Sequence, residues 1–213
     1  MQATATATSP NRTIVYIDGF NLYFGLKAKG YKRFYWLDLE LLATNLLRPH
    51  HVLQAVRYFT ADIKAGMDKH RRQQTFLDAL KTHCTKLQII RGHYLIKQRQ
   101  CHRCGAVAQI PEEKKTDVNI ASFMLADAFT DQFDTAILVS GDSDLVPPIE
   151  TVRLYQPAKR VLVAFPPGRQ SEDLKRTAHG FFWINEQKLR ISLLPNPVVK
   201  PNGHQLFKPA TWK

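Results

Sequence analysis

Residues 135–144 are Thr-Ala-Ile-Leu-Val-Ser-Gly-Asp-Ser-Asp, an apolar run that ends in two carboxylates. A short, continuous apolar run bounded by small polar residues is typical of a strand buried on both faces of a parallel sheet. The acids Asp142 and Asp144 therefore follow directly after the carboxyl end of this strand. A helix is expected next, because prolines such as Pro147 and Pro148 are tolerated in a first helical turn.

The beginning of the chain repeats this arrangement. Thr13-Ile-Val-Tyr-Ile17 is a β-branched run that ends at Asp18, and helical spacing follows from Phe20 to Ala28. Apolar runs and amphipathic stretches alternate through the rest of the chain, which predicts β-α-β units and an α/β fold with a mainly parallel central sheet. The further strands are expected at Val52–Thr60, Leu87–Ile96 and Arg160–Phe165, and the further helices at Leu37–Leu47, Met67–Cys84, Thr116–Asp131 and from Ser171.

The composition favours a single globular domain in a chain of 213 residues. Hydrophobic residues make up 44% and charged residues 23%, which is typical of folded proteins and not of disordered chains. We expect tails at residues 1–12 and 195–213 and a domain at 13–194 that includes a cysteine-containing loop insert at 98–112. Lys and Arg exceed Asp and Glu by 30 to 18, a net charge of +12, which favours an anionic partner such as RNA, DNA or a membrane surface.

Cysteine usage and hydropathy bear on the compartment and on a second metal. No apolar run approaches the roughly 20 residues of a membrane span, and residues 1–10 lack a basic leader with an apolar core, so we expect a cytoplasmic protein with no membrane partner. An odd count of three cysteines suits a reducing compartment.

Cys101 and Cys104 have the spacing of half a zinc site. Either a histidine, Cys84 or a second chain completes a Zn²⁺ site there, or the pair is an exposed dithiol.

The acidic residues at strand ends are the candidate site. In an open parallel sheet, ligands bind beyond the carboxyl ends of strands where the connections diverge. If the strands that end at Asp18 and before Asp142 are neighbours in the sheet, Asp18, Asp142 and Asp144 are expected to converge in one crevice. Asn21 would point the same way, and Asp117 could add a fourth carboxylate. Clustered carboxylates repel one another unless a cation lies between them, and a hard ion such as Mg²⁺ or Mn²⁺ prefers oxygen ligands and commonly shares them with phosphate.

A purely structural role is the alternative for each acid. Asp and Ser are favoured at helix N-termini and turns, so Asp18, Asp117, Asp142 and Asp144 could each be a cap. For any one of them alone, capping is the better explanation. Gly-Asp-Ser-Asp after a buried strand, however, places two acids where one cap is needed, which favours a functional site for the set.

Four ordered blocks of sequence carry a family resemblance. Val15-Tyr-Ile-Asp-Gly-Phe-Asn-Leu22, Glu113-Lys-Lys-Thr-Asp-Val-Asn-Ile120, Leu138-Val-Ser-Gly-Asp-Ser-Asp-Leu145 and Phe165-Pro-Pro-Gly-Arg-Gln-Ser171 together resemble the NYN domain, a branch of the PIN-like nuclease superfamily. The resemblance spans about residues 13–194. It implies a Rossmann-like (PIN-like) three-layer fold and a metal-dependent ribonuclease, and by analogy products with a 5′-phosphate and a 3′-hydroxyl.

The resemblance also implies roles for individual residues. The catalytic set would be Asp18, Asn21, Asp117, Asp142 and Asp144, and its four acids would hold Mg²⁺ or Mn²⁺, with Asp18 and Asp142 as direct ligands and Asn21 orienting water or phosphate. Some relatives carry a further acid on the helix after the position of Asp117. Here Asp127 lies ten residues further on, a rotation of about 280°, so it should face elsewhere, and this puts a firmly held second metal in doubt.

Basic and polar residues near the expected crevice are candidates for substrate contact. Lys115 precedes Asp117, while Arg169 and Ser171 flank a helix start, where backbone donors and a nearby Arg suit an RNA phosphate. A solvated helix face is the equally good alternative for each residue taken alone. Tyr23 and Phe24, one turn beyond Asn21, are further candidates for contact with substrate.

Other functions remain open from sequence. A non-catalytic RNA-binding or regulatory module would keep the same acids for metal-assisted docking of phosphate. A phosphotransfer enzyme or phosphatase also begins from a strand that ends in Asp, but Phe20 stands where such a site needs a second acid. A protein-interaction scaffold would use the proline-rich end. The basic surface is compatible with a homodimer.

Overall fold

The computed structural model describes residues 10–62, 66–100 and 104–213. Its centre is a six-stranded sheet in the order β3-β2-β1-β6-β7-β8, and every neighbouring pair of strands is parallel. This confirms the predicted α/β class. The strands are β1 (Asn11–Asp18), β2 (His51–Thr60), β3 (Leu87–Arg91), β6 (Thr135–Val139), β7 (Arg160–Phe165) and β8 (Gly180–Trp183).

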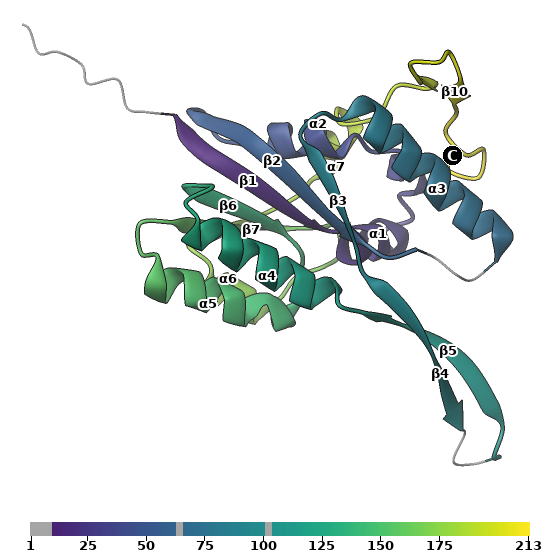
Figure 1. Ribbon diagram of the computed structural model, residues 1–213, viewed down its shortest axis with the longest axis horizontal. Helices are drawn as coiled ribbons and strands as arrows, with labels where there is room; N and C mark the ends of the chain where they lie inside the picture. The colour runs from purple at the N-terminus through teal and green to yellow at the C-terminus, as the bar shows by residue number, and fades with distance from the viewer. Residues whose placement is uncertain (1–9, 63–65, 101–103) are drawn as a thin grey trace, which may run out of the picture.

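Helices cover both faces of the sheet and complete three layers (Figure 1). One face carries α1 (Gly19–Ala28), α2 (Leu39–Leu46), α3 (Met67–His83) and α7 (Glu186–Arg190). The other face carries α4 (Thr116–Phe129), α5 (Val146–Tyr155) and α6 (Glu172–Thr177). Of the two short 3-10 turns, η1 (Lys32–Phe34) lies between α1 and α2, and η2 (Ser143–Leu145) lies between β6 and α5.

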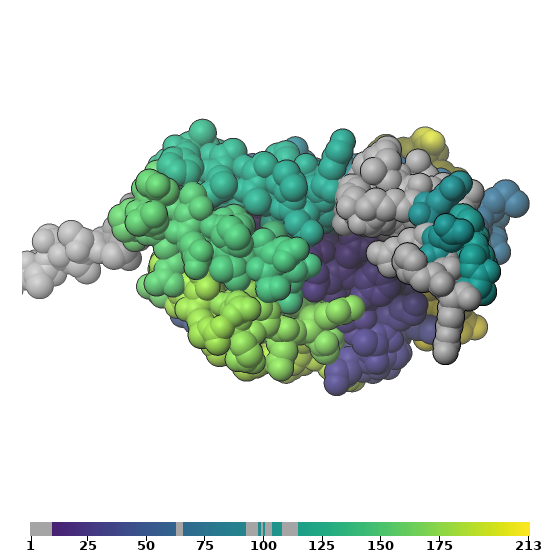
Figure 2. All heavy atoms as spheres, turned by 90° about the horizontal axis from the view of Figure 1, so that it is seen from below, coloured from purple at the N-terminus to yellow at the C-terminus, as the bar shows by residue number. Residues whose placement is uncertain are grey.

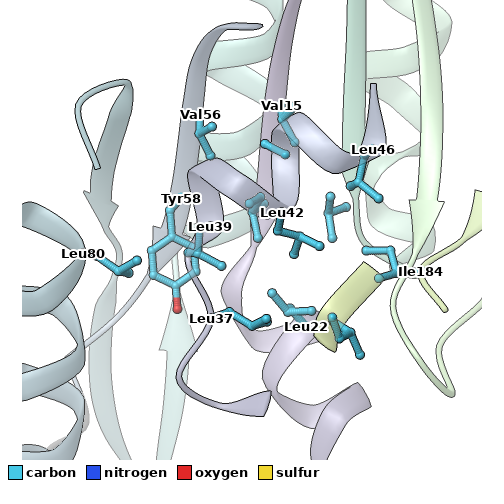
Figure 3. Packing of buried hydrophobic residues seen from close by; sticks show 14 of the residues in the cluster. Val15, Leu22, Leu37, Leu39, Leu42, Leu46, Val56, Tyr58, Leu80 and Ile184 are labelled. Atoms are coloured by element: carbon cyan, nitrogen blue, oxygen red, sulfur yellow. The ribbon is translucent and has the colours of Figure 1, made fainter. Parts of the chain in front are cut away.

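Side-chain alternation along β1 builds two separate cores. Val15 and Ile17 pack into the core under α1, α2 and α3, which Figure 3 shows from close by, while Ile14 and Tyr16 pack into the core under α4 and α5. Residues of a strand point alternately to its two faces. A run of consecutive apolar residues, such as 14–17 in β1 and 136–139 in β6, is therefore suited to the middle of a covered sheet, and both strands occupy that position.

The winding of the chain reverses between β1 and β6. Counting only the strands of this sheet, their order is 3-2-1-4-5-6, so the connections from β1 run toward one edge and those from β6 toward the other. In such sheets the connecting loops diverge at the carboxyl ends of the two central strands and leave a crevice there. Asp18 and the Ser140–Asp144 turn lie at this position.

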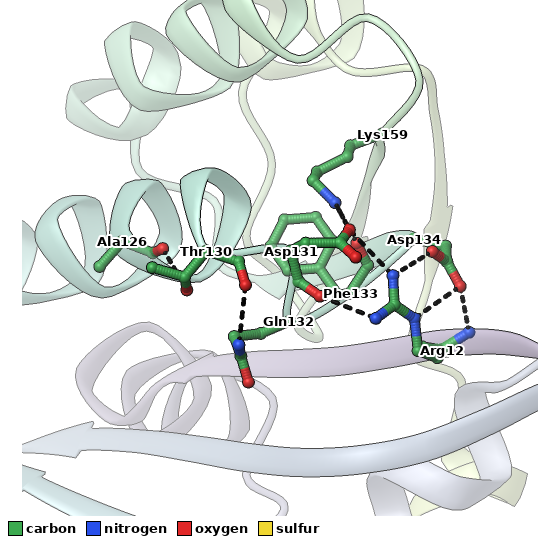
Figure 4. A network of polar contacts seen from close by, with 8 residues as sticks. All are labelled: Arg12, Ala126, Thr130, Asp131, Gln132, Phe133, Asp134 and Lys159. Carbon is green, nitrogen blue, oxygen red and sulfur yellow. Dashed lines mark hydrogen bonds and ion pairs between the residues drawn. The ribbon is translucent and has the colours of Figure 1, made fainter.

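An ionic network holds the amino-terminal ends of β1 and β6 together, at the end of the sheet opposite the crevice (Figure 4). The Arg12 guanidinium donates to both carboxylate oxygens of Asp134, at 3.2 and 2.7 Å, and to Asp131. The Lys159 ammonium, which is 6% exposed, donates to the Asp131 carboxylate at 2.6 Å and to the Phe133 carbonyl at 2.7 Å. These contacts fix the start of β1 against the turn that leads into β6.

The cysteine-containing insert is a hairpin and not the loop expected at 98–112. β4 (His93–Gln100) and β5 (Val107–Lys114) pair antiparallel, and the hairpin extends away from the central sheet (Figure 1). The expected strand Leu87–Ile96 is also wrong, since it divides at Gly92. β2 ends at Thr60, whose carbonyl accepts from Gly92 N–H, so the chain beyond has no sheet partner and pairs with β5 instead.

Both ends of the chain differ from the predicted tails. β1 begins at Asn11, two residues before the expected domain start, and residues 1–9 lie outside the described part of the chain. The C-terminal segment carries β9 (Val198–Val199) and β10 (Gln205–Leu206) and packs against α3 (Figure 1). Val198, Leu206 and Trp212 explain this packing, because they bury apolar surface in the core that α1, α2 and α3 share.

Within the part of the chain that the structure describes, no helix combines the length and apolar character that a bilayer crossing requires.

Candidate active site

Asp18 is the centre of the candidate site. It is the last residue of β1 and the N-cap of α1, and one of its carboxylate oxygens accepts from the Phe20 and Asn21 N–H groups, each at 3.0 Å. The other oxygen accepts from Asn21 Nδ2 at 2.6 Å and from Ser140 Oγ at 2.9 Å. With only 2% of its surface exposed, Asp18 is held in one orientation by four donors.

The environment of Asp18 opposes its negative charge. Burial raises the pKa of Asp18, hydrogen bonds from Asn21 and Ser140 partly offset this, and the nearby charge of Asp142 raises it again. A raised pKa of this origin means that the ionised form lacks sufficient compensation in the protein alone. A cation between Asp18 and Asp142 would supply that compensation.

Ser140 and Asn21 tie the ends of β1 and β6 together. Ile17 pairs with Val139 in the two adjacent strands, so the next residues, Asp18 and Ser140, leave the sheet side by side. The buried Ser140 hydroxyl accepts from Asp142 N–H at 3.1 Å, and Asn21 Oδ1 accepts from Gly141 N–H at 3.2 Å. Each side chain thus bridges the loop after β1 and the turn after β6.

Asp142 shapes the turn in which it lies. Its carboxylate accepts from Asp144 N–H at 3.1 Å and caps η2. The side chain is partly exposed, so its remaining lone pairs can reach solvent or a ligand. Asn21 and Ser140 therefore connect Asp18 to the backbone of the turn that contains Asp142.

The positions of Asp117 and Asp144 follow from the elements that carry them. Asp144 is exposed and lines a hollow with Glu150, Asp173 and Arg176 between η2, α5 and α6. Asp117 is partly exposed in the first turn of α4, which packs against η2 and begins at the same edge of the sheet. Within residues 10–62, 66–100 and 104–213, no group of three or more His, Cys, Asp or Glu side chains is placed to hold a metal ion.

The donor set at Asp18 and Asp142 nevertheless fits a hard cation. All of its donors are oxygens: the two carboxylates, the Asn21 amide oxygen and the Ser140 hydroxyl. Mg²⁺ is commonly bound through one or two carboxylates, with waters and substrate phosphate in the other positions. Cys104 is exposed, and its expected zinc-binding partner Cys101 lies outside the described residues.

Arg169 borders this site. A Cβ on Gly141 would lie 3.0 Å from Arg169 Cβ, and one on Gly25 would lie 3.2 Å from Arg169 Cγ, so Arg169 occupies the space between α1 and the Ser140–Asp144 turn. Ser171 is the N-cap of α6, and its hydroxyl accepts from Leu174 N–H at 3.3 Å. Lys115 is exposed just before α4.

Asp127 has a structural role away from this crevice. Its carboxylate accepts from the Tyr16 hydroxyl at 2.6 Å and from the Arg57 guanidinium at 2.5 Å. Asp127 is only 5% exposed, and it projects from α4 onto the middle of β1 and β2, as the rotation along the helix predicts.

An aromatic cavity of about 450 Å³ lies along α1. It begins at Gly19 and Phe20, directly after Asp18, and extends between α1, η1, α3 and Trp212. Figure 2 shows the dark purple start of α1 at the surface next to the teal and green helices α4 and α5.

The sequence did not reveal the cavity or the role of Ser140. The cavity combines segments from α1, α3 and the chain end that only folding brings together. A signal for Ser140 was present, since a single hydroxyl residue ends the run of five apolar or β-branched residues in β6.

Comparisons with known proteins agree with the fold. The sequence pattern of the NYN domain matches residues 12–185. The chain is 30% identical to 6-hydroxy-3-succinoylpyridine 3-monooxygenase HspA of Pseudomonas putida (strain DSM 28022 / S16), over 96% of this chain and 76% of that protein. A crystal structure of a protein of unknown function from Vibrio parahaemolyticus superimposes with a TM-score of 0.57 at 18% identity, covering 89% of this chain and 99% of that one.

Proposed function

The chain belongs to the NYN domain family of PIN-like nucleases, and from this premise we propose that it is a metal-dependent ribonuclease that hydrolyses RNA phosphodiester bonds endonucleolytically. The hydrogen-bonded unit of Asp18, Ser140 and Asp142 at the point where the winding of the sheet reverses is the observation that supports this proposal. Its products would carry a 5′-phosphate and a 3′-hydroxyl.

In this proposal, the chain supplies rigid anionic ligands. Asp18 and Asp142 would hold Mg²⁺ or Mn²⁺, and Asp117 and Asp144 would add oxygen ligands directly or through water. Asn21 and Ser140 keep the Asp18 carboxylate in place by donating to it. When bound, the ion would lower the pKa of a water molecule and stabilise charge on the leaving oxygen.

The basic side chains bring the substrate to this acidic site. The net charge of +12 attracts an RNA backbone that the carboxylates alone would repel. Arg169, which lies next to the Ser140–Asp144 turn, would contact a phosphate beside the cleaved bond. Lys115 and the region of Ser171 would contact neighbouring phosphates.

Cleavage of labelled single-stranded RNA with Mn²⁺ tests the proposal. The wild-type protein should cut, and Asp142→Asn should cut at least roughly 100-fold more slowly, with little change in melting temperature. Asp78→Asn is the matched control, because Asp78 is a half-exposed acid on α3 that pairs with Lys200. Equal rates for wild type and Asp142→Asn, or no metal-dependent cleavage by the wild type, would contradict the assignment.

A non-catalytic RNA-binding module is the second candidate. Its support is that Asp18 already accepts four hydrogen bonds, about as many as an ionised carboxylate can accept. In that case RNA would be retained in the same assay without being cut.

Oxidation of a small heteroaromatic acid is the third candidate. Its support is the name of the relative from Pseudomonas putida together with the aromatic cavity beside Asp18. Such a reaction needs dioxygen and an electron donor, so NADH-dependent oxygen uptake with 6-hydroxy-3-succinoylpyridine is the measurement that separates it from hydrolysis of RNA.

A further inference from the structure

The cavity beside Asp18 has walls suited to a flat ring. Tyr23 and Tyr35 have ring centroids 5.1 Å apart, and Tyr35 meets Trp212 edge-on at 5.6 Å. Phe76 closes the far side against Trp212 at 6.0 Å. Its volume of about 450 Å³ falls within the usual range for pockets that enclose small ligands.

The cavity is not filled by the protein core. Tyr23 and Phe24 on α1 line it, and each is 41% exposed. Large aromatic side chains are mostly buried in folded proteins, so a group of partly exposed rings around a hollow indicates a binding surface.

Positive charge surrounds these rings. Lys27, Lys69 and Arg72 line the cavity. Among the residues that the structure describes, Lys69 and Arg72 form no ion pair. A purely apolar ligand would gain nothing from these cations, whereas a flat ring linked to an anionic group would use both the rings and the cations.

The cavity also begins next to the candidate active site along the chain. Gly19, the residue after Asp18, lines it, and a Cβ on Gly19 would lie 2.8 Å from the Tyr58 ring and 2.6 Å from the Phe59 carbonyl. The start of α1 therefore contributes Asp18 to the candidate active site and the next residue, Gly19, to the cavity wall.

We infer that this cavity receives one unpaired nucleobase of the RNA, next to the phosphate that is bound at Asp18 and Asp142. This inference rests on the proposed ribonuclease function. The base stacks on Tyr23 and Tyr35, and Arg72 and Lys69 contact the phosphates that flank it. A single enclosed base selects unpaired RNA over a duplex, whose bases are stacked inside the helix.

Binding of a five-nucleotide RNA to the Asp142→Asn protein, followed by fluorescence anisotropy, tests this inference. Replacing one nucleotide at a time by an abasic one should weaken binding roughly 5- to 150-fold at one position, the range for loss of one stacked base, and little elsewhere. When Tyr23→Ala is added, this loss of affinity at one abasic position, the positional penalty, should disappear. Phe129→Ala, an exposed ring on α4, should leave it unchanged.

A second pair of variants, Arg72→Ala and Arg71→Ala, tests whether the cations at the cavity contact phosphates. Arg72→Ala should weaken intact and abasic RNA equally and reduce the salt dependence of binding by about one phosphate contact. Arg71→Ala, the neighbouring exposed residue on the same helix, should change binding less. Equal effects of the two variants would contradict the placement of phosphates at this rim.

Competition distinguishes an RNA base from other occupants. Adenosine monophosphate should displace the RNA only at concentrations well above the RNA's dissociation constant, and nicotinate should compete more weakly still. A nucleotide that binds more tightly than the RNA, or nicotinate that binds more tightly than the nucleotide, would overturn the inference, as would the absence of any positional penalty. Cleavage by the wild-type protein is measured separately. A protein that does not cleave RNA but loses affinity at one abasic position would contradict only the nuclease proposal. A protein that cleaves RNA but shows no such position would contradict only the base-binding cavity.

Discussion

The Ser140 hydroxyl donates a 2.9 Å hydrogen bond to the Asp18 carboxylate across the ends of two neighbouring strands. The same hydroxyl accepts from Asp142 N–H, so one buried side chain positions both acids of the candidate site. The charge of Asp142 also raises the pKa of the buried Asp18, and a counter-charge would relieve this unfavourable interaction. The position of the two acids therefore indicates a site for a ligand more strongly than their presence in the sequence does.

Ser140→Ala should destabilise the protein by about 1–3 kcal/mol, because the buried Asp18 carboxylate loses a donor. RNA cleavage should fall less than for Asp142→Asn, since both acids remain. Urea unfolding and initial cleavage rates measure the two effects. Ser143→Ala, at an exposed position in the same turn, is the control, and wild-type values for Ser140→Ala would argue against its positioning role.

Asp127→Ala should destabilise the protein by about 3 kcal/mol, since the buried Tyr16 hydroxyl loses its acceptor and the partly buried Arg57 loses its carboxylate partner. Asp62→Ala removes the partner of Arg91 in an exposed pair and should cost less than about 1 kcal/mol. Chemical denaturation compares the two variants. Cleavage per folded molecule should be unchanged in Asp127→Ala, and a specific loss of activity would instead place Asp127 in the site.

Stability should fall in acid partly through the network at Arg12. The Arg12 guanidinium lowers the pKa of Asp134, and Lys159, with Arg12, lowers that of Asp131 to about 2. A lowered pKa means that the stabilisation is complete above the ordinary value of 3.8 and is lost as the pH falls toward about 2. Urea midpoints from pH 5 to pH 2 should therefore decline less steeply in Asp134→Asn. An identical decline would contradict this contribution.

Cys84 should resist alkylation in the folded protein. Burial, and then the charge of Asp38, raise the pKa of the Cys84 thiol to about 12, and its Sγ donates to Asp38 Oδ1 at 3.4 Å. Iodoacetamide at pH 8 should modify the exposed Cys104 at least roughly 10-fold faster than Cys84, since the thiolate is the reactive form. Peptide mass spectrometry follows both sites, and comparable rates in the native protein would show that Cys84 is accessible.

Local sequence was sufficient for the central strands and for most helices. The apolar runs of β1 and β6 can be satisfied only in a covered sheet, and the acids that follow them then lie at its carboxyl edge. The helix expected at Leu37–Leu47 begins instead at Leu39, because the Asp38 side chain accepts from Leu41 N–H and caps it. Such an error of two residues is local and leaves the topology unchanged.

Long-range partners were not predictable in the same way. The division of the chain at Gly92 depends on where β2 ends, and the burial of Trp212 depends on Trp36 and Phe76, far away in sequence. The cavity needs α1, α3 and the chain end together. No short window of sequence contains such relationships.

The sequence by itself determined the α/β class, the family and the position of Asp18 and Asp142 after the ends of two strands, because strand periodicity and the acids are properties of neighbouring residues. Only the tertiary structure decided that these strands are neighbours, that Ser140 joins the two acids, that Asp127 pairs with Arg57, and that aromatic rings from remote segments enclose a cavity along α1. Side-chain direction and burial result from the packing of whole elements against one another, and that packing is fixed by contacts between residues far apart in the chain.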